Sequence, residues 1–122
     1  MESGVEVVVN ESVQLQSVSI TTIRAIFGMR LRTWPNGAPI QVFVLADDHP
    51  AHVAFCKGIL NIFPHQIRLA WDRLVFSGTG QAPYQVRTER EMRLLVATTP
   101  GAIGYLGDGM IDRSVRVPTI KQ

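Results

Sequence analysis

A capped helix that runs directly into a turn and an apolar strand is the feature of this sequence that most restricts its fold. Thr88 and Glu91 have the spacing of a capping box, in which the threonine hydroxyl accepts the N–H of the glutamate. Apolar side chains at helical intervals then predict a helix over residues 88–98. A turn with Pro and Gly separates this helix from an apolar strand predicted at residues 102–106. A helix that leads straight into a buried strand favours a sheet with helices packed on it.

The other apolar patterns alternate between strands and helices. Their order, β-α-β-α-α-α-β-β, predicts an α/β fold with a mixed, mostly parallel sheet in a single three-layer-like domain. We expect this domain to span residues 1–122, with residues 1–4 disordered or foreign to the natural chain and residues 118–122 as a tail. Further strands are expected at residues 5–9, 40–45 and 115–117. Further helices are expected at residues 19–27, with Ser19 as cap, and at residues 50–60 and 64–75, each opened by a proline. The apolar positions expected for the last of these helices are Ile67, Ala70, Trp71, Leu74 and Val75.

Composition excludes several classes of protein. Hydrophobic residues make up 46% of the 122 residues and charged residues 18%, as in a globular domain. Ten of the twelve basic residues are arginines, but they are scattered and the net charge is only +2, so we expect no nucleic-acid partner. The single cysteine, Cys56, rules out an intramolecular disulfide, and we expect it to be buried, as we do Trp34 and Trp71. No apolar run of about 18 residues is present, so no membrane span is expected.

Several pieces of the chain, taken together and in order, carry a resemblance to a known family. They resemble one lobe of the phosphate-binding receptors of ABC transporters, which have the type II periplasmic binding fold. The pieces are residues 7–10, 23–28, 34–37, 40–45 and 78–80, Phe55, Leu60, Trp71, and the run from Val96 to Tyr105.

This resemblance implies a non-enzymatic, solute-binding-like protein in the periplasm or cell envelope. It implies phosphate or another small anion as ligand, and an ABC transporter or another envelope protein as partner. The first residues lack the basic and apolar regions of an export signal. Either the protein is cytoplasmic or such a signal is missing from this chain.

The loop that binds phosphate in these receptors is altered here. After the strand that ends at Leu45, the receptors carry an arginine, an aspartate and a Gly-Ser-Gly-Thr run at a helix start, where N–H groups face the anion. Only Asp47 matches this pattern. Leu45 lacks the guanidinium, Asp48 adds a negative charge, and Pro50 lacks an N–H donor. Each of these changes argues against phosphate binding.

Two segments nevertheless remain candidates for ligand binding. The first contains Asp47, Asp48, His49 and His52; its histidines are three residues apart and might hold a metal ion, although we favour capping by either aspartate with two solvent-facing histidines. The second is a glycine-rich run whose amides might cradle an anion or form a flexible loop. It comprises Ser77, Gly78, Thr79 and Gly80. We expect no resident metal and no cofactor.

Function therefore divides into two hypotheses. No serine or cysteine stands directly beside a histidine in sequence, and the adjacent Asp47 and Asp48 would point to opposite faces of a strand, so we expect no enzyme. The first hypothesis is a solute-binding accessory of a phosphate transporter. The alternative is a cell-envelope interaction or sensing module that kept the fold, lost the ligand and exposes an apolar surface. A homodimer that rebuilds a two-lobe cleft would reconcile the two.

Overall fold

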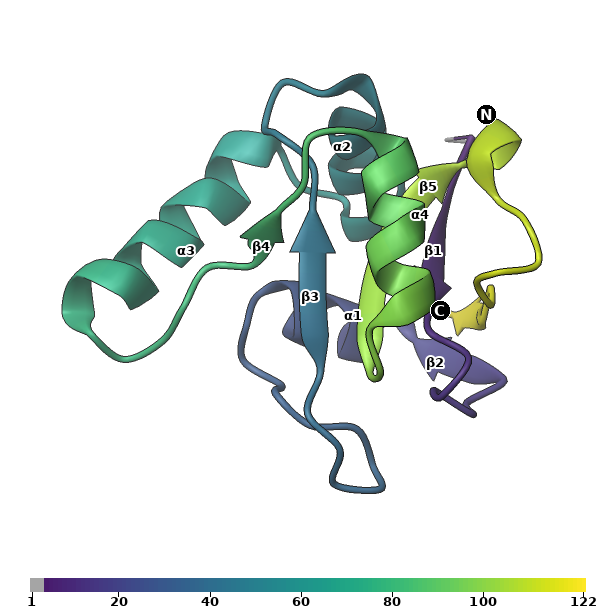
Figure 1. Cartoon of the computed structure of the whole chain (residues 1–122). Helices are drawn as coiled ribbons and strands as arrows, with labels where there is room; N and C mark the ends of the chain where they lie inside the picture. Colours follow the sequence, from purple (N-terminus) through teal and green to yellow (C-terminus); the bar gives the residue numbers. More distant parts are fainter. Residues whose placement is uncertain (1–3) are drawn as a thin grey trace.

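A four-stranded sheet lies at the centre of the computed structural model, which describes residues 4–122 (Figure 1). The strand order is β1-β5-β3-β4; β3 runs parallel to both β4 and β5, and β1 is antiparallel to β5. The sheet is therefore mixed and mostly parallel, as the sequence predicts. Its strands are β1 (Val5–Val9), β3 (Gln41–Val44), β4 (Tyr84–Gln85) and β5 (Ala102–Gly107).

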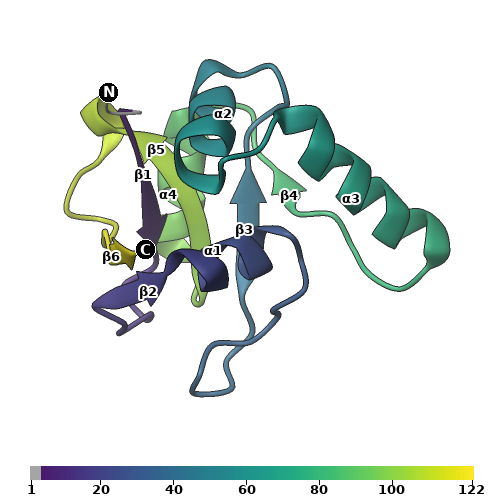
Figure 2. The ribbon, with the colours of Figure 1, turned by 180° about the vertical axis from the view of Figure 1, so that it is seen from behind.

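Helices cover both faces of this sheet. Helix α4 (Glu89–Thr98) lies on one face, and α1 (Ile20–Phe27) and α2 (Pro50–Phe55) lie on the other (Figures 1 and 2). A π-helical turn, Cys56–Leu60, extends α2, and a 3₁₀ turn, Asp108–Met110, follows β5. Helix α3 (Pro64–Ser77) stands beside β4 and extends away from the sheet (Figure 2). No helix within residues 4–122 has the length and apolar character needed to cross a bilayer.

Strand β5 is the centre of the core. Every residue from Ala102 to Leu106 is buried, which explains its continuous apolar sequence. Neighbouring side chains of a strand point to opposite faces. Tyr105 therefore faces α2, where its ring stacks on Phe55 at 4.1 Å between centroids. Gly104 faces α4, where an added Cβ would come within 2.5 Å of Met92 Sδ, so a larger residue here would force the Met92 side chain to shift.

The caps and packing anchors expected from the sequence are confirmed. Ser19 accepts the N–H of Thr22 at 3.0 Å at the start of α1, and Thr88 accepts the N–H of Glu91 at 3.0 Å at the start of α4. Trp34, Trp71 and Cys56 are all buried. Local spacing was sufficient for these predictions because each depends on residues close together in the chain or on apolar character alone.

The C-terminal region differs from expectation. Residues 115–117 do not form a strand; Arg116 makes only an isolated bridge with Val9. The supposed tail instead contains β6 (Thr119–Lys121), which pairs in parallel with β2 (Ser17–Ser19), a strand that we did not expect. Strands of three residues are too short to show an alternation of apolar and polar residues, and these two form only through their pairing with each other.

Expectations for the N-terminus and for α3 also need correction. Gly4, expected to be disordered, accepts a hydrogen bond through its carbonyl from the N–H of Asp108 at 2.9 Å, whereas residues 1–3 lie outside the described residues. The apolar face expected for α3 is only partly buried, because Ala70 and Val75 are exposed. Only the side chains that reach the body of the domain, chiefly Ile67 and Trp71, are covered.

Replacing Gly101 with alanine should destabilise the fold by about 2 kcal/mol or more. Gly101 has φ +78°, and an added Cβ would lie 2.3 Å from the carbonyl oxygen of Pro39. Gly78→Ala is the matched control, because Gly78 has φ +72° and nothing within 4 Å of an added Cβ. It should cost only about 1 kcal/mol, from the backbone alone. Urea denaturation measures both, and equal losses would contradict the steric argument.

Candidate functional site

The carboxyl ends of three parallel strands meet at one edge of the central sheet. Because β3 is parallel to both β4 and β5, the segments that follow these strands all leave from this edge. Ligands of open α/β sheets bind outside the carboxyl ends of the strands. The first candidate segment, residues 47–52, leaves β3 here and leads into α2.

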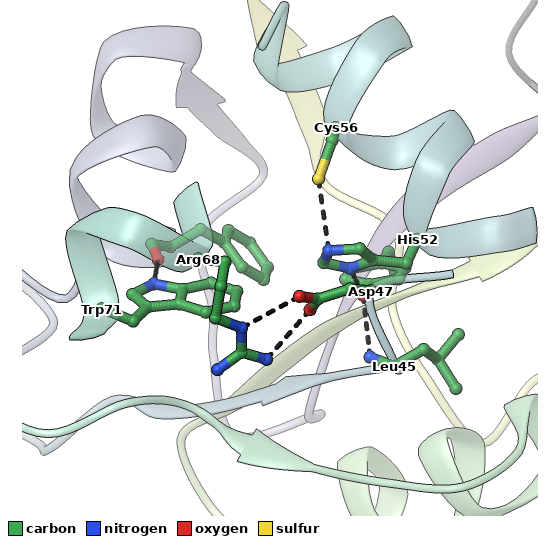
Figure 3. A network of polar contacts seen from close by, with 8 residues as sticks. Leu45, Asp47, His52, Cys56, Arg68 and Trp71 are labelled. Carbon is green, nitrogen blue, oxygen red and sulfur yellow. Dashed lines mark hydrogen bonds and ion pairs between the residues drawn. The ribbon is translucent and has the colours of Figure 1, made fainter. Parts of the chain in front are cut away.

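Asp47 and Arg68 form a bidentate ion pair at this edge (Figure 3). Arg68 Nε donates to Oδ2 at 3.0 Å, and Nη2 donates to Oδ1 at 2.9 Å. The guanidinium also lies over the ring of Trp71, 5.2 Å from its centroid. The hydrogen bonds from Arg68 hold the pKa of Asp47 below its ordinary value, against the opposing effect of burial. Asp47 is therefore ionised and its charge is balanced inside the protein.

Arg68 brings a guanidinium to an edge where the sequence near Leu45 provides none. Leu45 stands where the resembling receptors carry arginine, and it is fully buried. Arg68 arrives instead from α3, and its side chain is 34% exposed. Its third nitrogen, Nη1, makes no hydrogen bond within residues 4–122. The edge thus presents an arginine whose charge is matched by its own aspartate.

A buried chain of hydrogen bonds lies directly beneath the ion pair. Tyr105 Oη accepts the backbone N–H of Leu45 at 2.8 Å and lies 2.5 Å from His52 Nδ1. Because the hydroxyl oxygen already accepts the N–H of Leu45, we assign its own proton to the hydrogen bond with Nδ1, so that the hydroxyl acts as both acceptor and donor. This places the imidazole proton on Nε2, which faces Cys56 Sγ at 3.4 Å (Figure 3).

Burial keeps all three titratable groups of this chain neutral. Desolvation is the main reason that the pKa of His52 falls below 6.5; Asp47 opposes this effect, and Arg68 and His49 reinforce it. Desolvation also raises the pKa of the Cys56 thiol to about 12 and raises the pKa of Tyr105. A neutral imidazole beside a protonated thiol is a packed hydrogen-bond network rather than an activated nucleophile, which requires a thiolate.

The expected capping arrangement at the start of α2 was wrong. The helix is capped by His49, whose Nδ1 accepts the N–H of Ala51 at 3.0 Å, and not by Asp47 or Asp48. Nor do both histidines face solvent, because His52 is 1% exposed. Pro50 follows the cap as expected, since a proline fits the first turn of a helix. Asp47 is instead engaged by Arg68.

The two histidine rings are engaged separately, and Asp48 remains exposed at the surface. Within residues 4–122, no group of three or more His, Cys, Asp or Glu side chains is arranged to hold a metal ion. The first candidate segment therefore combines one internal ion pair, one helix cap and one buried imidazole.

Ser77–Gly80 lies at the other end of α3 and forms the C-terminal cap of that helix. Gly78 donates its N–H to the carbonyl of Val75 at 3.1 Å, and Thr79 and Gly80 both donate to the carbonyl of Leu74, at 3.1 and 3.2 Å. These amides are therefore already engaged. The C-terminal end of a helix also carries partial negative charge, which disfavours an anion. Arg68 lies near the start of α3 and Ser77 at its end, about 13 Å further along the axis, so the two candidate segments do not converge.

The N-terminus of α4, which starts at the same sheet edge as Asp47, is occupied by its own carboxylates. Glu91 Oε1 accepts the N–H of Arg87 at 2.7 Å, and Glu89 Oε1 accepts the N–H of Gly107 at 2.7 Å. Carboxylates are favourable at this positive end of a helix. An external anion at this position would have to displace groups that the chain supplies itself.

The sequence did not single out Arg68 or Tyr105 as members of one site. Tyr105 lies in an apolar strand and Arg68 in an amphipathic helix, so each has an ordinary local explanation. Their roles depend on contacts across long sequence separations, 60 residues for Leu45–Tyr105 and 21 for Asp47–Arg68. The one available signal was Asp47 itself, an acidic residue without the arginine that the resemblance implies at position 45, so that a cation from another part of the chain could pair with it.

Comparison with known proteins establishes the fold. No family model matches the chain, and no curated protein matches it. Solved structures of phosphate-transport receptors do match it. An ABC-type phosphate transport receptor from Vibrio cholerae superposes with a TM-score of 0.74 and 15% identity, over 96% of this chain and 46% of the receptor.

Two further structures agree. A proposed phosphate ABC transporter substrate-binding protein from Clostridium perfringens, solved with bound phosphate, has a TM-score of 0.76 and 17% identity over 98% of this chain and 47% of its own. PstS from Borrelia burgdorferi has a TM-score of 0.71 and 14% identity over 95% and 46%. The chain therefore spans slightly less than half the length of the receptors it matches and has the fold of one lobe. These similar proteins are described by what they bind and transport, not as enzymes.

Replacing Asp47 with asparagine should lower the free energy of unfolding by about 0.5–1 kcal/mol at neutral pH, because the pair is partly exposed to solvent. The folded-state pKa of Asp47 lies below its ordinary 3.8, so this contribution is present above pH 3.8 and is lost as the pH falls further. Chemical denaturation at several pH values measures the difference. Asp48→Asn is the control, since Asp48 is exposed and makes no ion pair within residues 4–122; an equal effect would contradict the assignment.

Replacing His52 with asparagine should flatten the dependence of stability on pH between neutral pH and about pH 5. The folded-state pKa of His52 is lowered below 6.5, so the unfolded chain binds the proton first and wild-type stability falls as the pH drops through 6.5. Asparagine can still accept from Tyr105 but does not titrate. His65→Asn, at an exposed histidine, should leave the slope unchanged. Denaturation curves across this range would contradict the prediction if the two variants behaved alike.

Proposed function

We propose that this chain is a non-enzymatic lobe related to the substrate-binding components of phosphate ABC transporters, that it acts in the cell envelope, and that it works through contact with another protein. In this proposal the lobe has no phosphate pocket of its own. It corresponds to the alternative hypothesis from the sequence, in which the fold persists and the ligand is lost.

The ion pair between Asp47 and Arg68 is the observation that carries this proposal. It occupies the carboxyl end of β3, where an anion would need an uncompensated cation and unused N–H donors. The exposed carboxylate of Asp48 adds a further negative charge at this edge. An incoming phosphate would compete with an internal partner that is already held by two hydrogen bonds.

Exposed apolar side chains support the part of the proposal that concerns protein contact. Phe76 is 88% exposed and Leu69 is 50% exposed, both on α3, and Tyr84 on β4 is 61% exposed. Large exposed apolar surfaces often mark interaction sites. Two of these three side chains lie on α3, the helix that also carries Arg68.

One observation favours a second candidate function, weak anion binding at the first segment. Arg68 keeps Nη1 without a hydrogen bond inside residues 4–122, and its side chain is 34% exposed. In this second candidate function, a small anion binds Nη1 while Asp47 holds Nε and Nη2. The residues from Asp47 to His52 and from Ser77 to Gly80 remain the positions where such binding is to be sought.

A two-dimensional NMR titration of the labelled chain with phosphate at low salt distinguishes these functions. Our proposal expects no saturable shifts at millimolar phosphate, with sulfate and divalent metal ions as further probes. Saturable shifts confined to residues 47–52 or 77–80 would contradict it. If such shifts occur and disappear in Arg68→Gln, while Arg73→Gln on the same helix retains them, the second candidate function is the correct one.

A further inference from the structure

The side of α3 that faces away from the domain carries an unusual set of side chains. Ile67 and Trp71 form the buried stripe of this helix, 6% and 1% exposed. The residues about half a turn away form what we call the outer face. They follow the helical spacing i, i+3, i+4, i+7 and are Leu69, Asp72, Arg73 and Phe76. Two apolar side chains thus flank a central pair of opposite charges.

This outer face is accessible in the folded chain. Figures 1 and 2 show α3 extending from the body of the domain, with only the connection to β4 running beside it. Phe76, near the free end of the helix, is 88% exposed, and Leu69 is 50% exposed. A phenylalanine so fully exposed contributes nothing to the core, so the fold itself does not account for its presence.

The pattern on the outer face is complementary to itself. A twofold axis between Asp72 and Arg73, perpendicular to the helix, would place a second copy of α3 antiparallel to the first. Asp72 would then lie opposite Arg73 of the partner subunit, and Leu69 would lie opposite Phe76 of the partner subunit. The same two pairings repeat on the other side of the axis, as an isologous interface requires. The charges attract only in this antiparallel register.

We propose that the outer face of α3 binds the same face of a second copy of this chain. This inference rests on the proposed function and names the partner that the proposal leaves open. Charge complementarity favours a second copy over an unrelated protein, because the acidic Asp72 and the basic Arg73 that would pair across the interface are both present on this helix. A single helix pair buries less than the roughly 800 Å² per partner of a standard interface. We therefore expect a dissociation constant in the micromolar range or weaker.

Sedimentation equilibrium from micromolar to millimolar concentration tests the proposal. The wild-type chain should pass from monomer to dimer over this range. Phe76→Ser should weaken the association about tenfold or more, because the apolar contact between Phe76 and Leu69 of the partner subunit is lost on both sides of the axis. Leu94→Ser is the matched control, since Leu94 is 61% exposed but lies on α4; it should have no effect. Circular dichroism verifies that both variants remain folded.

Charge reversal then tests the register of the two helices. Asp72→Arg alone and Arg73→Asp alone should each weaken self-association, because like charges would face one another across the axis. An equimolar mixture of these two variants should restore the dimer, since each reversed charge then meets its complement. Asp72 also acts electrostatically on Arg68, and the mixture controls for this because each chain retains its own substitution.

A chain that stays monomeric at millimolar concentration would overturn the α3 interface while leaving the proposed function to the phosphate titration. A dimer that is insensitive to Phe76→Ser, or variants whose mixture does not associate, would also overturn it. Saturable phosphate shifts beside an intact α3 dimer would instead overturn the proposed loss of the anion pocket and leave the interface standing.

Discussion

The hydroxyl group of Tyr105 joins three elements on which the candidate site depends. The hydroxyl oxygen accepts the backbone N–H of Leu45 at the end of β3, and it forms a hydrogen bond with His52 of α2. The ring of Tyr105 stacks on Phe55, also of α2. Because β5 is buried along its length, this hydroxyl has no access to solvent and must find its partners inside the protein. Those partners fix where the chain leaves the sheet and so place Asp47 within reach of Arg68.

The polar groups at the carboxyl edge of the sheet are largely engaged with one another. An anion site needs donors and positive charge that are not already used. Here several donors near the helix ends bind the chain itself. His49 accepts an N–H at the start of α2, Thr88 accepts one at the start of α4, and the carbonyl of Leu74 accepts two amides that follow α3. The positive charge of Arg68 is matched by Asp47.

The prediction of how the first segment caps α2 failed for a physical reason that is visible at particular residues. Sequence reasoning assigned Asp47 or Asp48 to the cap of α2 because an aspartate before a helix is favoured there. It could not foresee that an arginine on another helix would engage Asp47 and leave the cap to His49. Likewise, His52 was expected to face solvent because Tyr105, which binds its Nδ1, lies 53 residues away in the sequence. Cys56 is only one helical turn from His52, but that spacing does not show that the imidazole is buried.

The sequence by itself determined the class of fold and much of its local structure. The caps at Ser19 and Thr88, the prolines that begin α2 and α3, and the unbroken apolar strand β5 all depend on short-range spacing or on hydrophobic pattern. Tertiary structure alone decided the pairing of β2 with β6, the partner of Asp47 and the exposure of Phe76. These depend on which distant segments meet when the core closes, and pairings of that kind leave no periodic trace in the chain.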